Sequence, residues 1–261
     1  MKAIILSAGQ GKRLLPLTAE CPKCILPIQG QSLIEWQIDE LFRCGIDRVT
    51  VIVGYRADKV EKLLNRRYGP QLVQTLYNAA YAKTDNLISC WAARHEMNED
   101  FVLLNGDTLF EAAVLQRLLR APDRPVTVVI SHKDEYDADD MKVELNGCRL
   151  IQIGKDLAPD KVDGESIGMI LFRGKGPVLF RSAIGNALHN PSSAKQWYLS
   201  VINDMAREIP VWTCSIQGLQ WCEVDYPADI KQAEKVVNVC ADNGDPKNGA
   251  ARSQLKELSM V

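Results

Sequence analysis

The sequence predicts an α/β protein with a central sheet that is mixed and mostly parallel. In the first half, short apolar runs typical of buried strands, such as 3–6 and 49–53, alternate with longer segments that have apolar residues at helical spacing, such as 33–42. Strands joined through helices pair in parallel. After residue 120, strand-like runs follow one another with fewer helices between them, which predicts strands of both directions in the second half.

The elements of the first half are placed by this pattern. Strands are expected at 3–6, 49–53, 72–77 and 101–104, and helices at 33–42, 57–68 and 86–97. Ser32-Leu33-Ile34-Glu35 is typical of a capping box, in which Ser32 bonds the N3 amide and Glu35 reaches back, so the first long helix should begin there. The glycine-containing stretch after the first strand therefore does not lead straight into a helix.

The second half is divided in the same way. Strands are expected at 126–130, 142–145, 150–153, 166–172, 211–216 and 219–224, and helices at 178–188 and 196–207. Pro227 suits the first turn of a closing helix that runs to Cys240. Residues 1–240 are expected to form a single domain, and residues 241–261, which are polar and contain Gly and Pro, a loosely ordered tail.

Charge and hydropathy exclude several classes of protein. The 31 Lys and Arg of the 261-residue chain nearly balance its 33 Asp and Glu, so neither nucleic acid nor an anionic membrane is expected as a partner. No apolar run reaches the length of a membrane span, and the N-terminus lacks the features of a secretory signal. A cytoplasmic location is expected, and the sequence carries no signal of its oligomeric state.

The cysteines are expected to be ordinary thiols. Most lie in apolar segments, as small buried side chains do: Cys44, Cys90, Cys148, Cys214, Cys222 and Cys240. Cys21 and Cys24 form a C-x-x-C pair, but a zinc site needs a second pair of ligands, and the three histidines lie far apart in the sequence. Metal or redox use of this pair is disfavoured.

The stretch after the first strand carries glycines and cations. The bare backbone of Gly9 and Gly11 can approach phosphates, although a glycine turn alone can be purely structural. A dinucleotide fingerprint would need a third glycine where this chain has Leu14. Arg13 and Lys23 add two cations, which a triphosphate calls for and a hydride-transfer cofactor does not. The stretch therefore favours a triphosphate site.

Two aspartates are placed where strands are expected to end. Asp107 follows the strand at 101–104, and Asp225 follows the strand at 219–224. Open parallel sheets bind ligands at the carboxyl ends of their strands. Mg²⁺ takes few carboxylates and completes its shell with water and phosphate oxygens, so two aspartates are sufficient. Each aspartate taken alone also suits a residue that caps a turn.

These residues carry a family resemblance. L-S-A-G-Q-G-K-R-L-L-P-L-T followed by C-P-K-C-I-L-P resembles the signature of nucleotidyltransferases with the glycosyltransferase-A-like fold, which join a nucleoside triphosphate to a phosphorylated acceptor and release pyrophosphate. Further similarity lies at 104–107, 153–155 and 223–225, and the resemblance covers residues 1–240. It implies a Rossmann-like three-layer α/β/α fold with a mixed, mostly parallel central sheet.

The resemblance also implies a role for each site residue. Asp107 and Asp225 would hold Mg²⁺ on the α-phosphate, and Arg13 and Lys23 would neutralise the triphosphate and the departing pyrophosphate. Lys155 would orient the acceptor phosphate for in-line attack. The residues expected at the nucleotide are Leu6, Ala8, Gly9, Gly11, Asp85, Asn86 and Gly106. Because the acceptor itself is the nucleophile, no Ser, Cys or His of the protein needs activation.

Three shorter motifs, at 81–91, 139–143 and 164–168, resemble most the phosphocholine cytidylyltransferase branch. Its relatives act on aminoethylphosphonate, inositol phosphate and other small phosphorylated alcohols, so the similarity implies CTP as the donor. Asp85 stands where this branch often has asparagine.

Some residues would suit an acceptor with a cationic head group, although the sequence does not identify the acceptor. The acidic stretch at 134–140 and an aromatic face from Trp197, Tyr198 or Trp221 suit an ammonium, although charged runs are commonly solvated loops and aromatics commonly core. The candidate acceptor-binding residues are Lys155, Glu165, Asp140 and Trp197.

Other classes of protein are weighed against this interpretation. A sugar-1-phosphate nucleotidyltransferase that uses UTP, GTP or dTTP shares the fold, the metal pair and the lysine, and it stays open as the alternative. A glycosyltransferase more often has Asp-x-Asp, whereas Thr108 and Leu109 follow Asp107. A regulatory domain without chemistry should have lost a charged position, and all five candidates are present: Arg13, Lys23, Asp107, Lys155 and Asp225.

Overall fold

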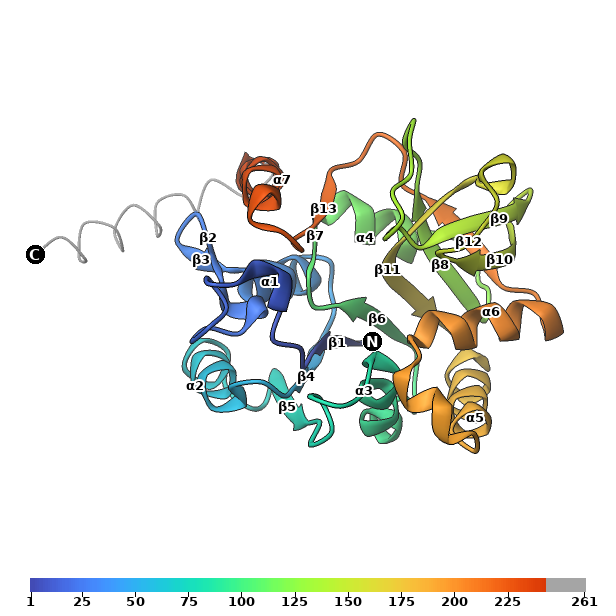
Figure 1. Cartoon of the computed structure of the whole chain (residues 1–261). Coiled ribbons are helices and arrows are strands. Elements are labelled where there is room, and N and C mark those ends of the chain that lie inside the picture. Colours follow the sequence, from blue (N-terminus) through green and yellow to red (C-terminus); the bar gives the residue numbers. More distant parts are fainter. Residues whose placement is uncertain (243–261) are drawn as a thin grey trace, which may run out of the picture.

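The computed structural model describes residues 1–242, in which a nine-stranded sheet lies between two groups of helices (Figure 1). In sheet order its strands are β5 (Val73–Tyr77), β4 (Arg48–Val53), β1 (Lys2–Ser7), β6 (Phe101–Asn105), β11 (Gly164–Phe172), β8 (Val126–Ser131), β12 (Trp212–Ser215), β10 (Arg149–Gly154) and β9 (Lys142–Asn146). Two small sheets pair β2 (Pro27–Ile28) with β3 (Gln31–Ser32), and β7 (Thr108–Phe110) with β13 (Trp221–Glu223). Except for its first two residues, the tail expected at 241–261 lies outside the described residues.

The strand directions are mixed. β1 is parallel to β4 and β6, β4 to β5, and β12 to β8. β11 is antiparallel to β6, β8 and β9, and β10 is antiparallel to β12 and β9. Within the nine-stranded sheet of the described chain, only β10 and β11 therefore run against the other strands. The predicted mixed, mostly parallel sheet is confirmed.

Helices cover both faces of this sheet. Helices α1 (Leu33–Arg43), α2 (Ala57–Arg67) and α4 (Ala112–Leu119) share one core with it, and α3 (Asn86–Ala92), α5 (Gly176–Ala187) and α6 (Tyr198–Glu208) share the other. Helix α7 (Ile230–Asp242) packs outside α1. Because successive strand residues point to opposite faces, Ile4 enters one core while Ala3 and Ile5 enter the other.

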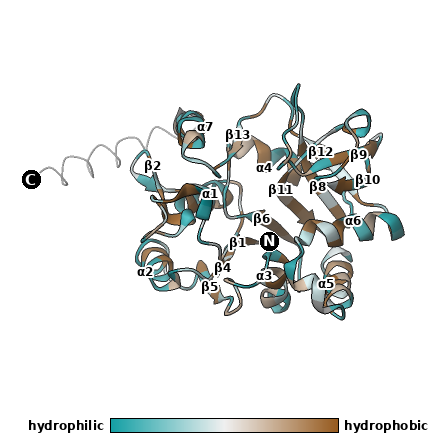
Figure 2. Ribbon diagram, viewed as in Figure 1, coloured by the Kyte–Doolittle hydropathy of each residue, from teal (hydrophilic) through white to brown (hydrophobic). Residues whose placement is uncertain are grey.

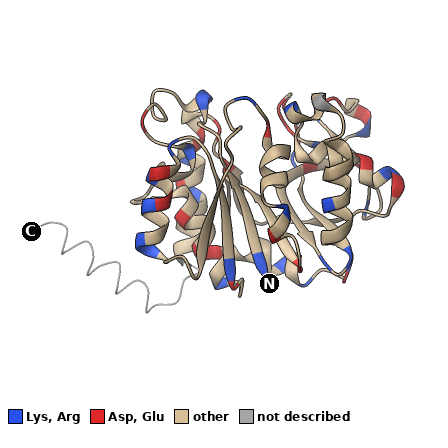
Figure 3. Cartoon of the chain, turned by 90° about the horizontal axis from the view of Figure 1, so that it is seen from below, with Lys and Arg blue, Asp and Glu red and all other residues tan. Residues whose placement is uncertain are grey.

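The pictures show the same three layers. Strands in the middle of the central sheet, such as β6 and β11, are largely brown in the hydropathy view (Figure 2). Seen from below, charged residues lie mainly on the outer helices and the loops, and the strands between them are largely free of charge (Figure 3). No helix within residues 1–242 combines the length and the apolar composition that crossing a membrane requires.

Most expected elements are present, with ends shifted by a few residues. The capping box of α1 is confirmed, with the amide of Ser32 donating to Glu35 Oε2 at 2.9 Å. The helix expected at 86–97 is wrong in length, because α3 ends at Ala92 and a tighter 3-10 turn leads to the fully buried Met97. Pro227 begins a separate 3-10 turn before α7.

Several elements and one cysteine differ from the expectations. The sequence pattern had assigned no element to the residues of β2, β3, β7 and α4. All eight cysteines are free, and Cys148 is exposed rather than buried, because it lies in the turn between β9 and β10, which no layer covers.

Candidate active site

The glycine loop begins where β1 ends and runs against Lys23. Gly11 has a φ of +76°, which glycine adopts without strain, and a Cβ at this position would lie 2.8 Å from Cβ of Lys23. Arg13 lies on the 3-10 turn Lys12–Leu14, and Lys23 begins the 3-10 turn Lys23–Ile25. The glycine therefore lets two cation-bearing turns pack together at the end of the strand.

Asp107 and Asp225 are brought together by the small β7–β13 sheet. Thr108, the residue after Asp107, pairs with Glu223, and the amide of Val224 donates to the carbonyl of Asp107 at 3.1 Å. This pairing places both carboxylates at the same end of the sheet. The two aspartates therefore converge, as expected from their positions after strands.

The ammonium of Lys23 lies between these carboxylates. Its Nζ is 2.8 Å from Asp107 Oδ2 and 2.6 Å from Asp225 Oδ1, and its side chain is only 12% exposed. Burial alone would lower the pKa of Lys23, but the two aspartates outweigh burial and raise that pKa above its usual value. Burial, together with Asp107 and Asp225, raises the pKa of Glu223. The aspartates at this centre therefore stabilise a cation and disfavour a further negative charge.

The carboxylates fit a divalent cation. Asp107 Oδ1 is buried and has no hydrogen-bond partner among the described residues, so one coordinating oxygen is not committed to the protein. No group of three His, Cys, Asp or Glu side chains within residues 1–242 is arranged to hold a metal ion by itself. Two carboxylates are nevertheless enough for Mg²⁺, which takes its other ligands from water and substrate phosphates.

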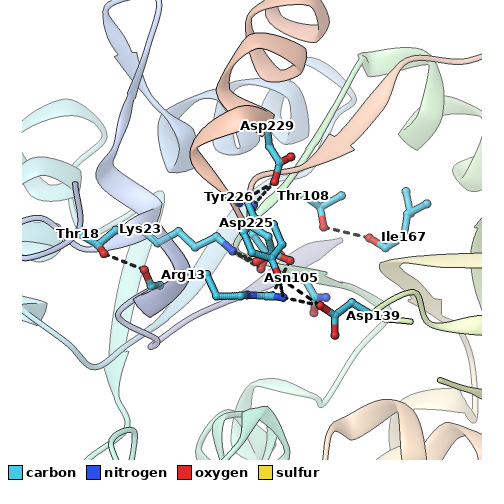
Figure 4. A network of polar contacts seen from close by, with 12 residues as sticks. Arg13, Thr18, Lys23, Asn105, Thr108, Asp139, Ile167, Asp225, Tyr226 and Asp229 are labelled. Atoms are coloured by element: carbon cyan, nitrogen blue, oxygen red, sulfur yellow. Dashed lines mark hydrogen bonds and ion pairs between the residues drawn. The ribbon is translucent and has the colours of Figure 1, made fainter. Parts of the chain in front are cut away.

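Arg13 connects the pair of aspartates around Lys23 to the more exposed Asp139 (Figure 4). Its guanidinium lies 2.8 Å from Asp225 Oδ2 and 3.0 Å from Asp139 Oδ2, and it stacks over the ring of Tyr226 at 5.0 Å. Burial would lower the pKa of Arg13, but a hydrogen bond with Tyr226 and the charge of Asp225 raise it. The side chain is thus held as a cation beside the aspartates.

Two cavities adjoin this cluster. The first has a volume of about 350 Å³, and every residue expected at the nucleotide lines it: Leu6, Ala8, Gly9, Gly11, Asp85, Asn86 and Gly106. The second has a volume of about 730 Å³, and every residue expected at the acceptor lines it: Lys155, Glu165, Asp140 and Trp197. Both cavities share a wall made of Arg13, Asn86, Asn105, Asp107, Trp197 and Asp225.

Acidic side chains of the second cavity surround Lys133. Its Nζ is 2.6 Å from Asp140 Oδ2 and 3.1 Å from Glu165 Oε2. Glu165 lies on β11, and its side chain is 7% exposed. Burial raises the pKa of Glu165, and Asp140 raises it further, although Lys133 opposes both effects.

Lys155 lies at another part of the same cavity. Its Nζ is 3.0 Å from Asp139 Oδ1 and lies 4.4 Å from the centre of the Trp197 ring. Asp139 therefore contacts both Arg13 and Lys155, whereas the sequence placed it only in the acidic stretch 134–140 that suits an ammonium.

The aromatic expectations are partly wrong. Tyr198 is fully buried, and its hydroxyl donates to the carbonyl of Gly168 at 3.3 Å, so its ring belongs to the core and cannot face an acceptor. Trp197 is 42% exposed and lines both cavities, and Trp221 lines the second. Of the acidic stretch, Asp134 and Glu135 do not line either of these cavities.

Several lining residues were missed by the sequence analysis. The first cavity also has Ser7, Cys24, Asn78, Tyr81, Thr84 and Ser89, and the second has Glu223, Tyr226 and Asp229. Glu223 precedes Asp225 by two residues, and alternate residues of a strand share a face, so this residue could have been found. Asn78 comes from the start of the connection after β5, which carries no local signal of a site. Tyr81, Thr84 and Ser89 lie in the motif at 81–91, but that motif gave them no individual role.

Comparison with known families matches residues 3–206 to the MobA-like NTP transferase domain. The chain belongs to this family. The resemblance to nucleotidyltransferases that the sequence carries is thereby confirmed, and the chain is a nucleotidyltransferase.

Relatives of this NTP transferase include cytidylyltransferases. The choline-phosphate cytidylyltransferase of Streptococcus pneumoniae is 25% identical over 244 residues, covering 91% of this chain and 98% of that protein. The CMP-5'-(3-aminopropyl)phosphonate synthase of Streptomyces rubellomurinus is 28% identical over 246 residues, or 90% of this chain, and the match spans 38% of that protein's length.

A solved structure supports the fold of the NTP transferase. The CTP:phosphocholine cytidylyltransferase from Streptococcus pneumoniae has a TM-score of 0.75 and 23% identity, and the match covers 90% of this chain and 98% of that one. The expected nucleotidyltransferase fold is confirmed.

Proposed function

We propose that this chain transfers a cytidylyl group from CTP to the phosphate or phosphonate of a small phosphorylated alcohol, such as phosphocholine or aminoethylphosphonate, and releases pyrophosphate. The observation that carries the proposal is the wall of Arg13, Asp107 and Asp225 at which two cavities meet. A transfer between two substrates needs such an arrangement because both must reach the same phosphorus atom. The names of the relatives support cytidylyl chemistry.

In the proposed reaction, an ionised oxygen of the acceptor attacks the α-phosphorus of CTP. A P–O bond forms there while the bond to the bridging oxygen of the β-phosphate breaks, and the electron pair of that bond leaves with pyrophosphate. Lys155 orients the acceptor phosphate from the second cavity. Arg13 and Lys23 lie at the shared wall or beside it, where negative charge increases as pyrophosphate departs.

Asp107 and Asp225 are the proposed ligands of Mg²⁺. The buried, unpartnered Oδ1 of Asp107 supports this assignment. The bound ion would neutralise charge on the α-phosphate and help to orient it. Lys23, which bridges the two aspartates here, would then be available to the triphosphate.

The head group of the acceptor is proposed to lie among Glu165, Asp140 and Trp197. Two carboxylates and the face of an indole ring are the groups that recognise an ammonium. The second cavity is larger than the first and is lined by acidic side chains, which supports a charged acceptor.

The test is the release of pyrophosphate in the presence of magnesium. CTP, UTP, GTP, ATP and dTTP are each combined with phosphocholine, aminoethylphosphonate, other phosphorylated alcohols and sugar-1-phosphates. Release is expected with CTP and an acceptor that carries an amine or ammonium. Release with a sugar-1-phosphate alone would overturn the proposed acceptor and establish the alternative, and CTP binding without release for any acceptor would overturn the transfer itself.

A further inference from the structure

The connection between β8 and β9, residues 132–141, forms much of the second cavity. We call it the β8–β9 loop. Its base is fixed by the buried Lys142, whose Nζ donates to the carbonyl of Asp137 at 2.6 Å and to the carbonyl of Lys155 at 3.0 Å. The loop is therefore held against the turn that carries Lys155. Four of its charged residues line the second cavity: Lys133, Asp137, Asp139 and Asp140.

Asp139 of this loop lies between the two cations that we assign to phosphate groups. Its Oδ1 is 3.0 Å from Lys155, and its Oδ2 is 3.0 Å from Arg13. Lys155 and, to a lesser extent, Arg13 lower the pKa of Asp139, so the group is an anion. An anion bound to Lys155 occupies the place that an acceptor phosphate requires.

Lys133, at the other end of the loop, has the opposite arrangement. Its ammonium lies between Asp140 and Glu165, at 2.6 Å and 3.1 Å. These are the carboxylates that we assign to the head group of the acceptor. A cation between them occupies the place that an acceptor ammonium requires.

We propose that Lys133 and Asp139 are internal competitors of the acceptor, a proposal that rests on the proposed function. Asp139 holds the phosphate subsite and Lys133 holds the ammonium subsite, and the acceptor binds by displacing both. The charged groups of each subsite therefore have a counter-ion both before and after the acceptor binds. Without such a counter-ion, the like charges of each subsite would face one another unpaired. The two residues therefore set the affinity for the acceptor and its dependence on the charge of the head group.

An acceptor without an amine has a different requirement. Its phosphate must still displace Asp139, but it can leave Lys133 between Asp140 and Glu165. The contribution of each competitor can thus be separated by comparing 2-aminoethylphosphonate with ethylphosphonate, which has the same anionic group and no amine.

The test measures the dissociation constants of these two probes by titration calorimetry with the full chain at pH 8.5. Asp139→Asn should tighten binding of both probes about two- to fivefold, the range expected when one exposed ion pair no longer competes. Lys133→Met should tighten binding of 2-aminoethylphosphonate by a similar factor and leave ethylphosphonate unchanged. Asp139 is 57% exposed and Lys133 is 34% exposed, so neither substitution removes a core side chain.

Matched controls remove the same charges elsewhere. Lys161, which pairs with Glu144, and Asp204, which pairs with Arg207, are exposed and do not line either of the two cavities. Lys161→Met and Asp204→Asn should leave both dissociation constants unchanged. A general effect of net charge would instead appear in these variants.

Several results would overturn the proposal. Weaker binding to Asp139→Asn would mean that Asp139 contacts the acceptor itself, and equal tightening of both probes by Lys133→Met would remove the ammonium subsite. If neither probe bound to the wild-type chain or to any variant, the proposed competition would be refuted. The binding test measures no turnover. Failure of pyrophosphate release with every acceptor would therefore count against the proposed function alone. The dissociation constants of the two probes would still decide whether Lys133 and Asp139 compete with the acceptor.

Discussion

Lys23 is the residue on which the geometry of the active site depends most directly. Two carboxylates about 4 Å apart repel each other by about 4 kcal/mol at an effective dielectric constant near 20, and the ammonium between Asp107 and Asp225 removes this cost. The two carboxylates can therefore lie close together before a metal ion arrives.

Asp107→Asn should lower kcat at least about a hundredfold, because the amide oxygen is a much weaker ligand for Mg²⁺ at the α-phosphate. The circular dichroism spectrum should be unchanged. Asp123→Asn is the matched control, since Asp123 is exposed and does not line the two cavities. Activity of Asp107→Asn close to that of the control would remove Asp107 from the proposed metal site.

Glu165→Gln should raise the Michaelis constant for an amine-bearing acceptor about tenfold, which corresponds to one charge-assisted contact of roughly 1.5 kcal/mol. The Michaelis constant for CTP should change much less, because Glu165 does not line the first cavity. Steady-state kinetics with each substrate varied in turn measures the difference. Equal effects on the two constants would argue against the assignment.

The binding of such an acceptor should also depend on pH. Burial raises the pKa of Glu165 to about 7, with Lys133 opposing this rise and Asp140 adding to it, and Glu223 interacts electrostatically with the same group. The carboxylate that attracts the ammonium is thus lost as the pH falls through this value. With 2-aminoethylphosphonate as the acceptor, the Michaelis constant should rise as the pH is lowered from 8.5 to 6. This rise should be smaller for Glu165→Gln.

Ethylphosphonate serves as the control for this pH profile. It has a phosphonate but no amine, so its Michaelis constant contains no contribution from an ammonium contact with Glu165. Identical profiles for the two acceptors with the wild-type protein would disprove the role given to Glu165.

Among the elements, β11 connects the two cavities. Glu165 near its start lines the second cavity, while Gly168 in its middle, at a shift of register against β8, has a φ of +71° and packs against Asn105 of the shared wall. A Cβ on Gly168 would lie 2.3 Å from Nδ2 of Asn105. Glycine is therefore needed at this position for two reasons: the backbone has a positive φ, and a Cβ would collide with Asn105.

Gly168→Ala should lower both stability and activity. The left-handed backbone alone costs an alanine roughly 1–2 kcal/mol, and displacement of Asn105 disturbs the wall between the cavities. Gly174→Ala is the control, because Gly174 also has a positive φ, +55°, but has no atom within 4 Å of its Cβ position. Urea unfolding should show a lower free energy of unfolding for both variants, whereas kcat/KM should fall only for Gly168→Ala.

The elements also show which parts of the fold and site can be predicted from sequence. Local signals sufficed for the start of α1 at Ser32 and for the aspartates after strands, because capping and strand ends depend on neighbouring residues. β7 is three residues long and pairs with β13 more than a hundred residues away, and no local pattern specifies that partner. The helical spacing of Val114, Leu115 and Leu118 in α4 was present in the sequence and was not used.

The charged contacts of the site were less accessible to sequence reasoning. The residues themselves indicated that Arg13 and Lys23 belong to a phosphate site, and the family resemblance added Lys155. Neither indicated which anions these cations contact when no phosphate is bound. Asp139 meets two of these cations only because the β8–β9 loop folds back over the cavity. Such contacts depend on the path of a loop, which hydrophobic periodicity does not specify.

At the scale of the whole molecule, nucleotide binding should stabilise the chain. CTP with Mg²⁺ at about a hundred times its dissociation constant adds about 2.7 kcal/mol, which is a rise in Tm of roughly 5–10 °C for a domain of this size. Differential scanning fluorimetry with and without EDTA tests this prediction. The rise should vanish in EDTA, and an equal rise in EDTA would show that the nucleotide binds without a divalent cation.

The two cavities draw on different stretches of the chain. Among the described residues, none from 108 to 196 lines the first cavity, whereas eight residues between Lys133 and Glu165 line the second. Substitutions in that interval can reshape the acceptor side while the donor side keeps its residues. The two relatives fit such a history, since their names give different acceptors, choline phosphate and an aminopropylphosphonate. The preference for the acceptor's head group can thus change, by evolution or by engineering, while the residues of the proposed nucleotide cavity stay the same.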